Sequence, residues 1–400
     1  MTARVRHVAI ATCLVATSIA HAQGTDEPGP AEPPVTDAAP AVPTPATPPP
    51  AEPRVEPAAI AEASVDKPAP FPRWSPARLA IDLELVTQGR YASKAGAYLS
   101  ELRLDRGELG ARVGLGDHAA AELRLETIRS ASDGGALGID GDSTVVRVKY
   151  ANVAGSAELG PVILDGALGF VADPWIRAIE DGYTLKPLSR TGSERLLGWP
   201  TSDLAALVRA TVGPARLAVS VGNGEGQRYP ERNDGKTTTA VAEVVAVNTD
   251  DIRASVAGMF RDGSIGVARV RDRRAGGGAN VITPWVRGGL DVVKAWGIGD
   301  RGDAEGLEIG GWADARIVEK LHVVARFATL GYTAGGRAST FGGAIAIEPW
   351  TGPGDARVRL WFALDRVTSS GVAMPLVGAD GGDATVAMLV ASATAPFLFD

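Results

Sequence analysis

Residues 79–85 read LAIDLEL, and this stretch decides the fold. Large aliphatic side chains occupy the odd positions, and Asp82 and Glu84 lie between them. This two-residue period is typical of a β-strand with one apolar and one polar face. The same alternation returns at 123–125, 146–150, 321–327 and 358–365. The chain after Trp74 is therefore predicted to be all-β.

Alternation alone does not separate a soluble sandwich from a lipid-facing barrel, because both have two unlike faces. Strand spacing is more informative, since transmembrane strands need about 9–11 residues and are joined alternately by short turns and longer loops. Long connections are expected at 88–96, 130–142, 171–202, 223–237, 262–281, 298–305, 331–338 and 367–383. Short ones are expected at 116–118, 154–156, 213–214, 248–250, 288–289, 318–320 and 351–355. The sequence predicts a transmembrane antiparallel β-barrel of about sixteen strands, within a range of about 14–18.

This even strand number depends on residues 97–115 forming one long strand. The apolar face of that segment changes phase near Gly107, so a β-bulge is expected there. The tryptophans Trp175, Trp199 and Trp350 lie near expected strand ends, where aromatic girdles of membrane barrels form. No run of 18 apolar residues follows the first 22 residues, so transmembrane helices are not expected.

The first 75 residues are predicted to carry no folded domain. Arg4 and Arg6 precede a short apolar run, and Ala20-His21-Ala22 fits signal-peptidase cleavage, so residues 1–22 are predicted to be a signal peptide. Sixteen of the 27 prolines fall between residues 24 and 76. Residues 23–75 are therefore expected to be a disordered Pro/Ala-rich linker in the periplasm, and residues 76–400 the barrel. A linker that contacts the cell wall and a spacer without a partner both stay open.

Composition excludes several classes of function. The formal net charge is −7 and no run of clustered Lys or Arg occurs, which argues against nucleic-acid binding. The single cysteine, Cys13, lies in the signal peptide, and only His118 and His322 remain in the mature chain. A thiolate metal site, a histidine metal site and a Ser-His-Asp triad are therefore not expected, and neither is a cofactor or an enzymatic activity.

Several motifs resemble the phosphate-selective group of outer-membrane porins. They are the segment 174–183 (PWIRAIEDGY), Ser193-Glu194-Arg195, Ser202-Asp203-Leu204 and the segment 221–226 (VGNGEG). The resemblance implies a sixteen-stranded barrel in a Gram-negative outer membrane that is usually trimeric and passes small hydrophilic solutes. Its phosphate-selective members use arginine ladders and loop lysines, whereas this chain has seven unclustered lysines.

With the apolar face directed outward, charged side chains are expected to line the lumen. The predicted pore-lining residues are Glu122, Arg124, Arg147, Lys149, Arg209, Arg216, Arg253, Arg316, Arg326, Arg357 and Arg359. The 171–202 connection is the longest and is expected to fold inward as a constriction loop, with Glu180, Asp181, Lys186, Arg190, Glu194 and Arg195 as candidates. These charges either set up a transverse field across the pore or pair with one another.

The sequence therefore favours an outer-membrane channel for passive diffusion of small hydrophilic solutes or ions, with anions such as phosphate among them. Its partners would be outer-membrane lipid, the solutes and, by the resemblance, further copies in a homotrimer. A soluble or surface-exposed β-sheet binding protein and an outer-membrane hydrolase are the alternatives.

Overall fold

The computed structural model describes residues 79–94, 97–129, 144–226, 234–265, 269–298, 301–352, 356–370 and 382–399. The predicted signal peptide (1–22) and linker (23–75) lie outside the described residues, as do most of the expected connections at 130–142 and 367–383. The barrel strands are β1 (Leu79–Lys94), β2 (Ala97–Gly114), β3 (Ala119–Arg129), β4 (Thr144–Leu159), β5 (Val162–Ala172), β6 (Ser202–Val212), β7 (Ala215–Gly222), β8 (Thr237–Asn248), β9 (Arg253–Asp262), β12 (Arg273–Ile282), β13 (Val286–Ile298), β14 (Arg301–Val318), β15 (Leu321–Tyr332), β16 (Arg337–Thr351), β17 (Arg357–Ser370) and β18 (Gly382–Phe399). The remaining elements are α1 (Pro174–Ile179), α2 (Gly192–Leu196), β10 (Ser264–Ile265) and β11 (Val270–Arg271).

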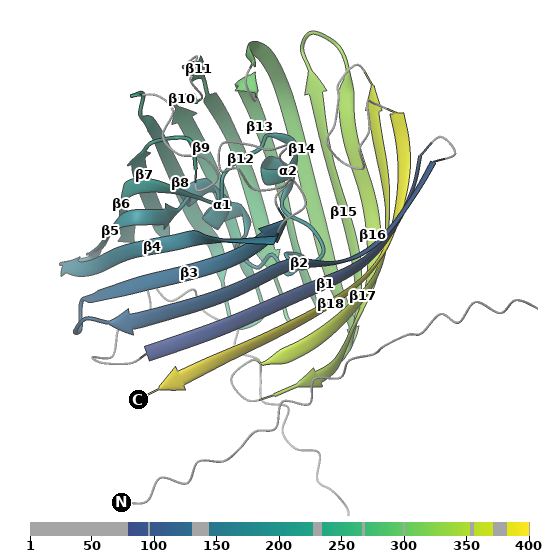
Figure 1. Ribbon diagram of the computed structural model, residues 1–400. Helices are drawn as coiled ribbons and strands as arrows, with labels where there is room; N and C mark the ends of the chain where they lie inside the picture. The colour runs from purple at the N-terminus through teal and green to yellow at the C-terminus, as the bar shows by residue number, and fades with distance from the viewer. Residues whose placement is uncertain are drawn as a thin grey trace, which may run out of the picture. The chain divides into compact units, whose positions relative to one another are not determined.

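Sixteen antiparallel strands form one closed sheet, which confirms the predicted fold class and strand number (Figure 1). Each strand pairs with its neighbours in chain order, except that β12 pairs with β9 across the small β10–β11 hairpin. The barrel closes where β1 pairs with β18, from Leu79 opposite Phe399 to Lys94 opposite Ala384. Closure leaves no free strand edge, which is the condition for a sheet to cross lipid.

The expected bulge lies in β2. The register between β1 and β2 shifts between Val86 and Thr87, which face Arg106 and Leu104, so Asp105 is the extra residue. This position is two residues from Gly107, where the sequence predicts the change of phase. Residues 97–114 accordingly form one continuous strand, as the even strand number requires.

Five expected connections are misplaced. The 88–96 connection is wrong because β1 continues to Lys94, and the 298–305 connection is wrong because β14 begins at Arg301. The 262–281 connection is wrong because it contains β12. The turn expected at 154–156 lies at 160–161 instead, and the turn expected at 288–289 precedes β13, at 283–285. Glycines caused the last error. A Cβ at Gly289 would lie 2.5 Å from both Asn280 Oδ1 and Trp312 Nε1, so this glycine serves close packing inside a strand rather than a turn.

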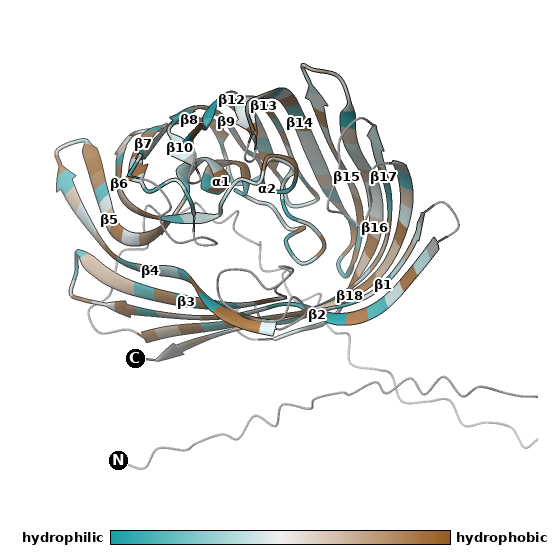
Figure 2. Ribbon diagram, turned by 45° about the horizontal axis from the view of Figure 1, so that its top comes forward, coloured by the Kyte–Doolittle hydropathy of each residue, from teal (hydrophilic) through white to brown (hydrophobic). Residues whose placement is uncertain are grey.

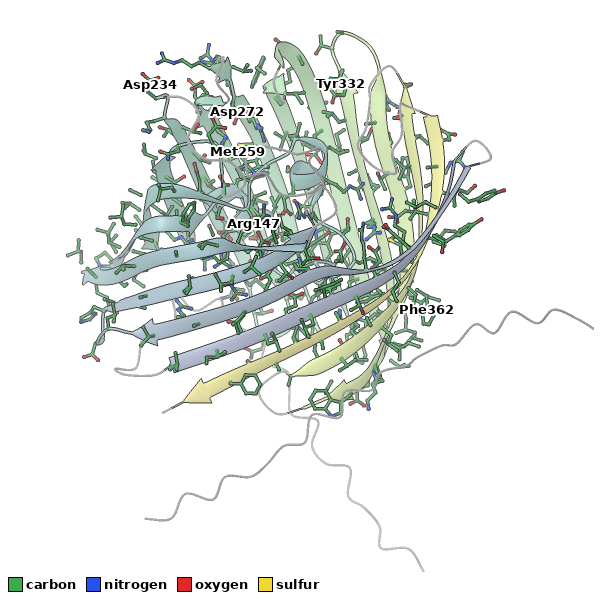
Figure 3. All side chains as sticks on the ribbon, viewed as in Figure 1. Arg147, Asp234, Met259, Asp272, Tyr332 and Phe362 are labelled. Carbon is green, nitrogen blue, oxygen red and sulfur yellow. The ribbon has the colours of Figure 1, made fainter. Side chains whose placement is uncertain are left out.

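The outer face of the barrel is apolar. Leucine, valine, isoleucine and phenylalanine side chains of alternate positions are exposed there, as Phe362 shows with 53% of its surface accessible (Figure 3). A continuous exposed apolar surface suits hydrocarbon rather than water. Trp350 is half exposed, as a girdle residue would be. Trp175 and Trp199 are fully buried, so their assignment to an interfacial girdle is wrong.

The connection between β5 and β6 folds inside the barrel. We call residues 173–201 the inner loop. It carries α1 and α2, and both helices lie within the ring of strands (Figure 2). Their contacts are with β7, β8, β9, β12 and β13 for α1 and with β14 and β15 for α2. The inner loop therefore occupies part of the lumen and determines how much of it stays open.

Candidate functional site

Local capping defines both helices of the inner loop. The Asp173 carboxylate accepts hydrogen bonds from the backbone N–H groups of Trp175 (2.9 Å) and Ile176 (3.3 Å), and Pro174 occupies the first helical turn. In α2, Thr191 and Glu194 form a capping box, in which each side chain accepts the backbone N–H of the other residue. These short-range bonds give the inner loop a fixed form even though each helix has only one or two turns.

Apolar packing holds the inner loop against two parts of the barrel wall. Trp175 and Trp199 lie with ring centroids 6.4 Å apart in a buried cluster that includes Met259 and Val293 of the wall. Leu185 and Leu188 pack against a second set of inward-facing side chains, which we call the apolar wall. The apolar wall consists of Val86, Val324, Ala344, Ala346, Trp361, Ala363 and Val390. The inner loop thus extends across the lumen from the β8–β9 side to the β15–β18 side.

Specific polar contacts fix the register of the inner loop. Thr184 Oγ1 donates to Asp314 (2.5 Å), and Asn280 Nδ2 donates to the carbonyl oxygen of Ala178 (2.7 Å). Close to the second contact, a Cβ at Gly278 would lie 3.3 Å from the Trp175 ring, so glycine at this position leaves room for the inner loop. The inner loop is therefore built into the barrel rather than resting on it.

The inner face of β2, β3 and β4 is charged, and its charges pair across strands. We call this the charged wall, and it consists of Arg106, Glu108, Glu122, Arg124, Glu126, Arg147 and Lys149. Lys149 Nζ lies 2.5 Å from Glu108 and 3.9 Å from Glu126, while Arg147 pairs with Glu126 at 2.7 Å. Arg124 reaches Asp82 of β1 at 2.8 Å. Because acidic and basic groups alternate within the network, this wall does not carry a field of one sign.

A water-accessible chamber of about 450 Å³ lies between the charged wall, β5–β8 and the inner loop. Five arginines and three carboxylates line it: Arg112, Arg124, Arg177, Arg209, Arg216, Glu122, Asp181 and Glu243. Two of the carboxylates are held by an additional buried guanidinium, because Arg253 pairs with Asp181 and lies 3.8 Å from Glu243. The lining is therefore cationic overall, with a positive charge in excess at neutral pH.

The predicted pore-lining residues fall into four places. Glu122, Arg124, Arg209 and Arg216 line the chamber, and Arg253 is buried beside it. Arg147 and Lys149 border a narrow space against the inner loop, and Arg326 pairs with Asp365 at 2.6 Å on the other side of the inner loop. The remaining three, Arg316, Arg357 and Arg359, line a separate pocket.

The six charged candidates of the inner loop have different surroundings. Asp181 borders the chamber, whereas Glu180 pairs with Lys186 at 2.7 Å. Glu194 is a helix-capping group. Arg195 Nη1 donates to Ser189 Oγ at 3.3 Å, and Arg190 borders two small spaces between the inner loop and the barrel wall. Most of these charges hold the inner loop together, and Asp181 is the one of the six that lines the chamber.

Burial changes the titration of two of these groups. Burial raises the pKa of Glu194, and the neighbouring Glu180 carboxylate raises it further. Burial acts to lower the pKa of Lys186, but the attraction of Glu180 outweighs it, so the pKa of this ammonium is raised. The Lys186 ammonium is therefore held in its charged form beside Glu180 inside the lumen.

Sequence reasoning missed Arg177 and Arg112 as chamber residues. Arg177 is exposed on α1, and its side chain has no hydrogen bond or ion pair with any described residue. Asp173-Pro174 signals a helix start, and Arg177 is then the polar position between the apolar residues 175–176 and 178–179. Arg112 becomes inward-facing only after the bulge at Asp105 is taken into account.

Two further properties concern the described residues as a group. No helix among them is long and apolar enough to cross a membrane. They contain no cluster of three or more His, Cys, Asp or Glu side chains that could hold a metal ion. His322 lies instead against Asp314, with Nδ1 2.8 Å from the carboxylate.

Comparison with known proteins identifies the fold. No protein-family model and no curated protein sequence matches the chain. Among solved structures it is similar to an anion-selective porin from Comamonas acidovorans, with 14% identity, a TM-score of 0.54 and coverage of 80% of this chain and 99% of the porin. It is also similar to OmpT, an outer-membrane protein of Vibrio cholerae, with 9% identity, a TM-score of 0.54 and coverage of 80% and 99%. At these identities the likeness shows that the chain has the barrel fold of outer-membrane porins.

Proposed function

We propose that the protein is an outer-membrane channel through which small hydrophilic solutes diffuse passively, with a preference for anions such as phosphate. A signal peptide at 1–22 would direct export, and the 23–75 linker would lie in the periplasm. The observation that carries the proposal is the chamber beside the inner loop, with five arginines facing three carboxylates. A cationic lining in a narrow lumen raises the local concentration of anions and repels cations.

The mechanism requires no chemical step. Solutes would follow the charged side of the lumen, because the inner loop packs against the apolar wall and fills that side. Arg177 would contact the passing anion directly, since its guanidinium is exposed in the chamber and has no described ion-pair partner. A passing anion can replace part of its own hydration with this group without first breaking an ion pair. The anion-selective porin from Comamonas acidovorans has the same fold, which is compatible with this preference.

The test is single-channel recording of the refolded mature chain in a planar bilayer, with the reversal potential measured under a salt gradient. We expect discrete open steps and a reversal potential whose sign indicates anion preference. Arg177→Gln should shift this potential towards the cation side. Arg337→Gln is the matched control, because Arg337 is an exposed arginine at the first residue of β16, outside the lining of the chamber.

Three outcomes would contradict the proposal. A folded, heat-modifiable barrel without conductance would favour a binding protein, and hydrolysis of a substrate by a non-conducting barrel would favour an enzyme. Equal shifts in the Arg177 and Arg337 variants would show that the chamber does not set the ion preference. Chemical crosslinking of the same preparation tests the homotrimer, which stays a prediction.

A further inference from the structure

A second cationic pocket lies away from the chamber, at the ends of β13–β17 next to the turns at 283–285 and 319–320. It has a volume of about 120 Å³, far smaller than the chamber. Its lining includes Arg287, Arg316, Arg357 and Arg359 together with Asp314 and Glu348. The chamber and this pocket share no lining residue.

One arginine of the pocket is already neutralised. Arg359 is buried, forms an ion pair with Glu348, and lies 3.9 Å from Asp314. Asp314 also accepts hydrogen bonds from Thr184 of the inner loop and faces His322. Both carboxylates of the pocket are thus engaged by Arg359 and its neighbours.

The other three arginines have no such partner. Arg287, Arg316 and Arg357 form no side-chain hydrogen bond or ion pair with any described residue. The Nε of Arg316 is buried without a hydrogen-bond acceptor, and its guanidinium lies 5.0 Å from the centroid of the Trp285 ring. Arg287 is attracted by Asp314 and repelled by Arg357, Arg359 and Arg316. Four guanidiniums thus share one small pocket with two carboxylates, Asp314 and Glu348, and an anion would offset the excess of positive charge.

We propose that this pocket is a binding site for a small oxyanion of the size of phosphate, held by Arg287, Arg316 and Arg357. Guanidinium groups bind tetrahedral and planar oxyanions through paired N–H donors, and the three arginines have no side-chain hydrogen bond or ion pair with a described residue that an anion would have to displace. The available volume accommodates a few heavy atoms rather than a sugar or a peptide. Asp314, Glu348 and Arg359 are buried, inward-facing side chains, so the ligand reaches the site from the aqueous lumen and not from the lipid.

The site is coupled to the inner loop through Asp314. The Asp314 carboxylate accepts a hydrogen bond from the Thr184 hydroxyl and lies 3.9 Å from Arg359. An oxyanion beside Arg359 therefore competes with Asp314 for the same guanidinium. Anion binding in the pocket should affect the inner loop through this one intervening residue. Binding does not depend on conduction, which allows the site to be tested separately from the channel.

The experiment is isothermal titration of inorganic phosphate into the folded chain in detergent at low ionic strength. We expect saturable binding to the wild type and at least about tenfold weaker binding to the Arg287→Gln/Arg357→Gln variant, because two charge-assisted contacts are lost. Both residues are exposed and lack described partners, so their replacement should leave folding intact. Folding is verified by heat-modifiable migration.

Arg337→Gln is the matched control, since it removes an exposed arginine that lines neither the chamber nor this pocket. Unchanged phosphate binding in this variant supports the proposal. Absence of saturable binding in the wild type, or an equal loss of binding in Arg337→Gln and in the double variant, overturns it. A Trp285→Phe variant adds an independent signal. Phosphate should change the tryptophan emission of the wild type and have a smaller effect in this variant, and equal changes in both would contradict a ligand beside Arg316.

Discussion

The charged wall and the apolar wall belong to the same sheet and have the same outward alternation, yet their inner faces differ in chemistry. On β2–β4 the inward positions carry arginine, lysine and glutamate in a continuous network of ion pairs. On β15–β18 they include valine, alanine and tryptophan beside buried pairs such as Arg326–Asp365, and the inner loop packs against the apolar ones. An inward-folded segment buries its own leucines most favourably on an apolar surface. The inner loop accordingly packs on the apolar wall, and the chamber lies beside the charged wall.

Removing the apolar anchors of the inner loop should have the largest effect. Replacing Trp175 and Trp199 together with alanine removes two fully buried side chains, each worth about 3–5 kcal/mol in a packed core. The inner loop should leave its position, and single-channel conductance should rise several-fold with increased open-channel noise. Trp350→Ala is the control, because this half-exposed residue lies outside the packed cluster. Unchanged conductance in the double variant would contradict the role of the inner loop in limiting the passage.

A change in the charged wall should act mainly on stability. Lys149→Met leaves Glu108 without its closest cationic partner, at 2.5 Å, and both groups are buried. Breaking one partner of a buried ion pair costs up to about 3–5 kcal/mol. The midpoint of heat-modifiable migration should therefore fall.

The control for this prediction is a pair on the surface. Arg366→Gln breaks an ion pair with Asp383 in which both side chains are 55% exposed, and such pairs contribute about 0–1 kcal/mol. A similar loss of stability in both variants would show that burial of the network has no effect. Lys149→Arg should retain most of the stability, because it keeps the cation.

The smallest expected effect is a pH dependence of the inner loop. The pKa of Glu194 is raised in the docked loop, first by burial and then by Glu180, so the docked form binds its proton more tightly than the undocked form. Docking is therefore most favourable below the ordinary pKa of a glutamate and weakens as the pH rises through the raised value. Open-channel noise should increase over this interval. Glu194→Gln should reduce the dependence, since the amide oxygen can still accept the capping bonds from Thr191.

A noise level in the wild type that does not change with pH would contradict this prediction. The same dependence in Glu194→Gln would show that another group titrates. Thr191→Ala separates the two contributions of the capping box, because it removes one cap acceptor while the Glu194 carboxylate remains. It should loosen the inner loop at every pH.

Part of the site was accessible from the sequence. Alternation identified Glu122, Arg124, Arg209 and Arg216 as inward-facing, and the length of the 171–202 connection indicated a segment that folds inward. The structure places these four side chains at the chamber and the inner loop inside the barrel. Arg287 and Arg177 were not found, because a strand boundary was misplaced at Gly288-Gly289 and the helix signal at Asp173-Pro174 was not used. The ion-pair partners of these residues could not be predicted either, since alternation gives the face on which a residue lies but not its partner on the neighbouring strand.

The sequence by itself determined the two-residue period and the spacing of fifteen turn and loop signals, because both depend only on neighbouring residues, and these favoured a β-barrel of about sixteen strands over a soluble β-sheet protein. It also determined the phase change in β2, which follows from the local order of apolar and charged residues. The tertiary structure alone decided that Trp175 and Trp199 are core residues of the lumen, and that Arg177, Arg112 and Arg209 meet at one chamber. Those positions depend on the register of sixteen strands and on the wall that the inner loop packs against. Both are set by contacts between residues far apart in the chain, which no local pattern records.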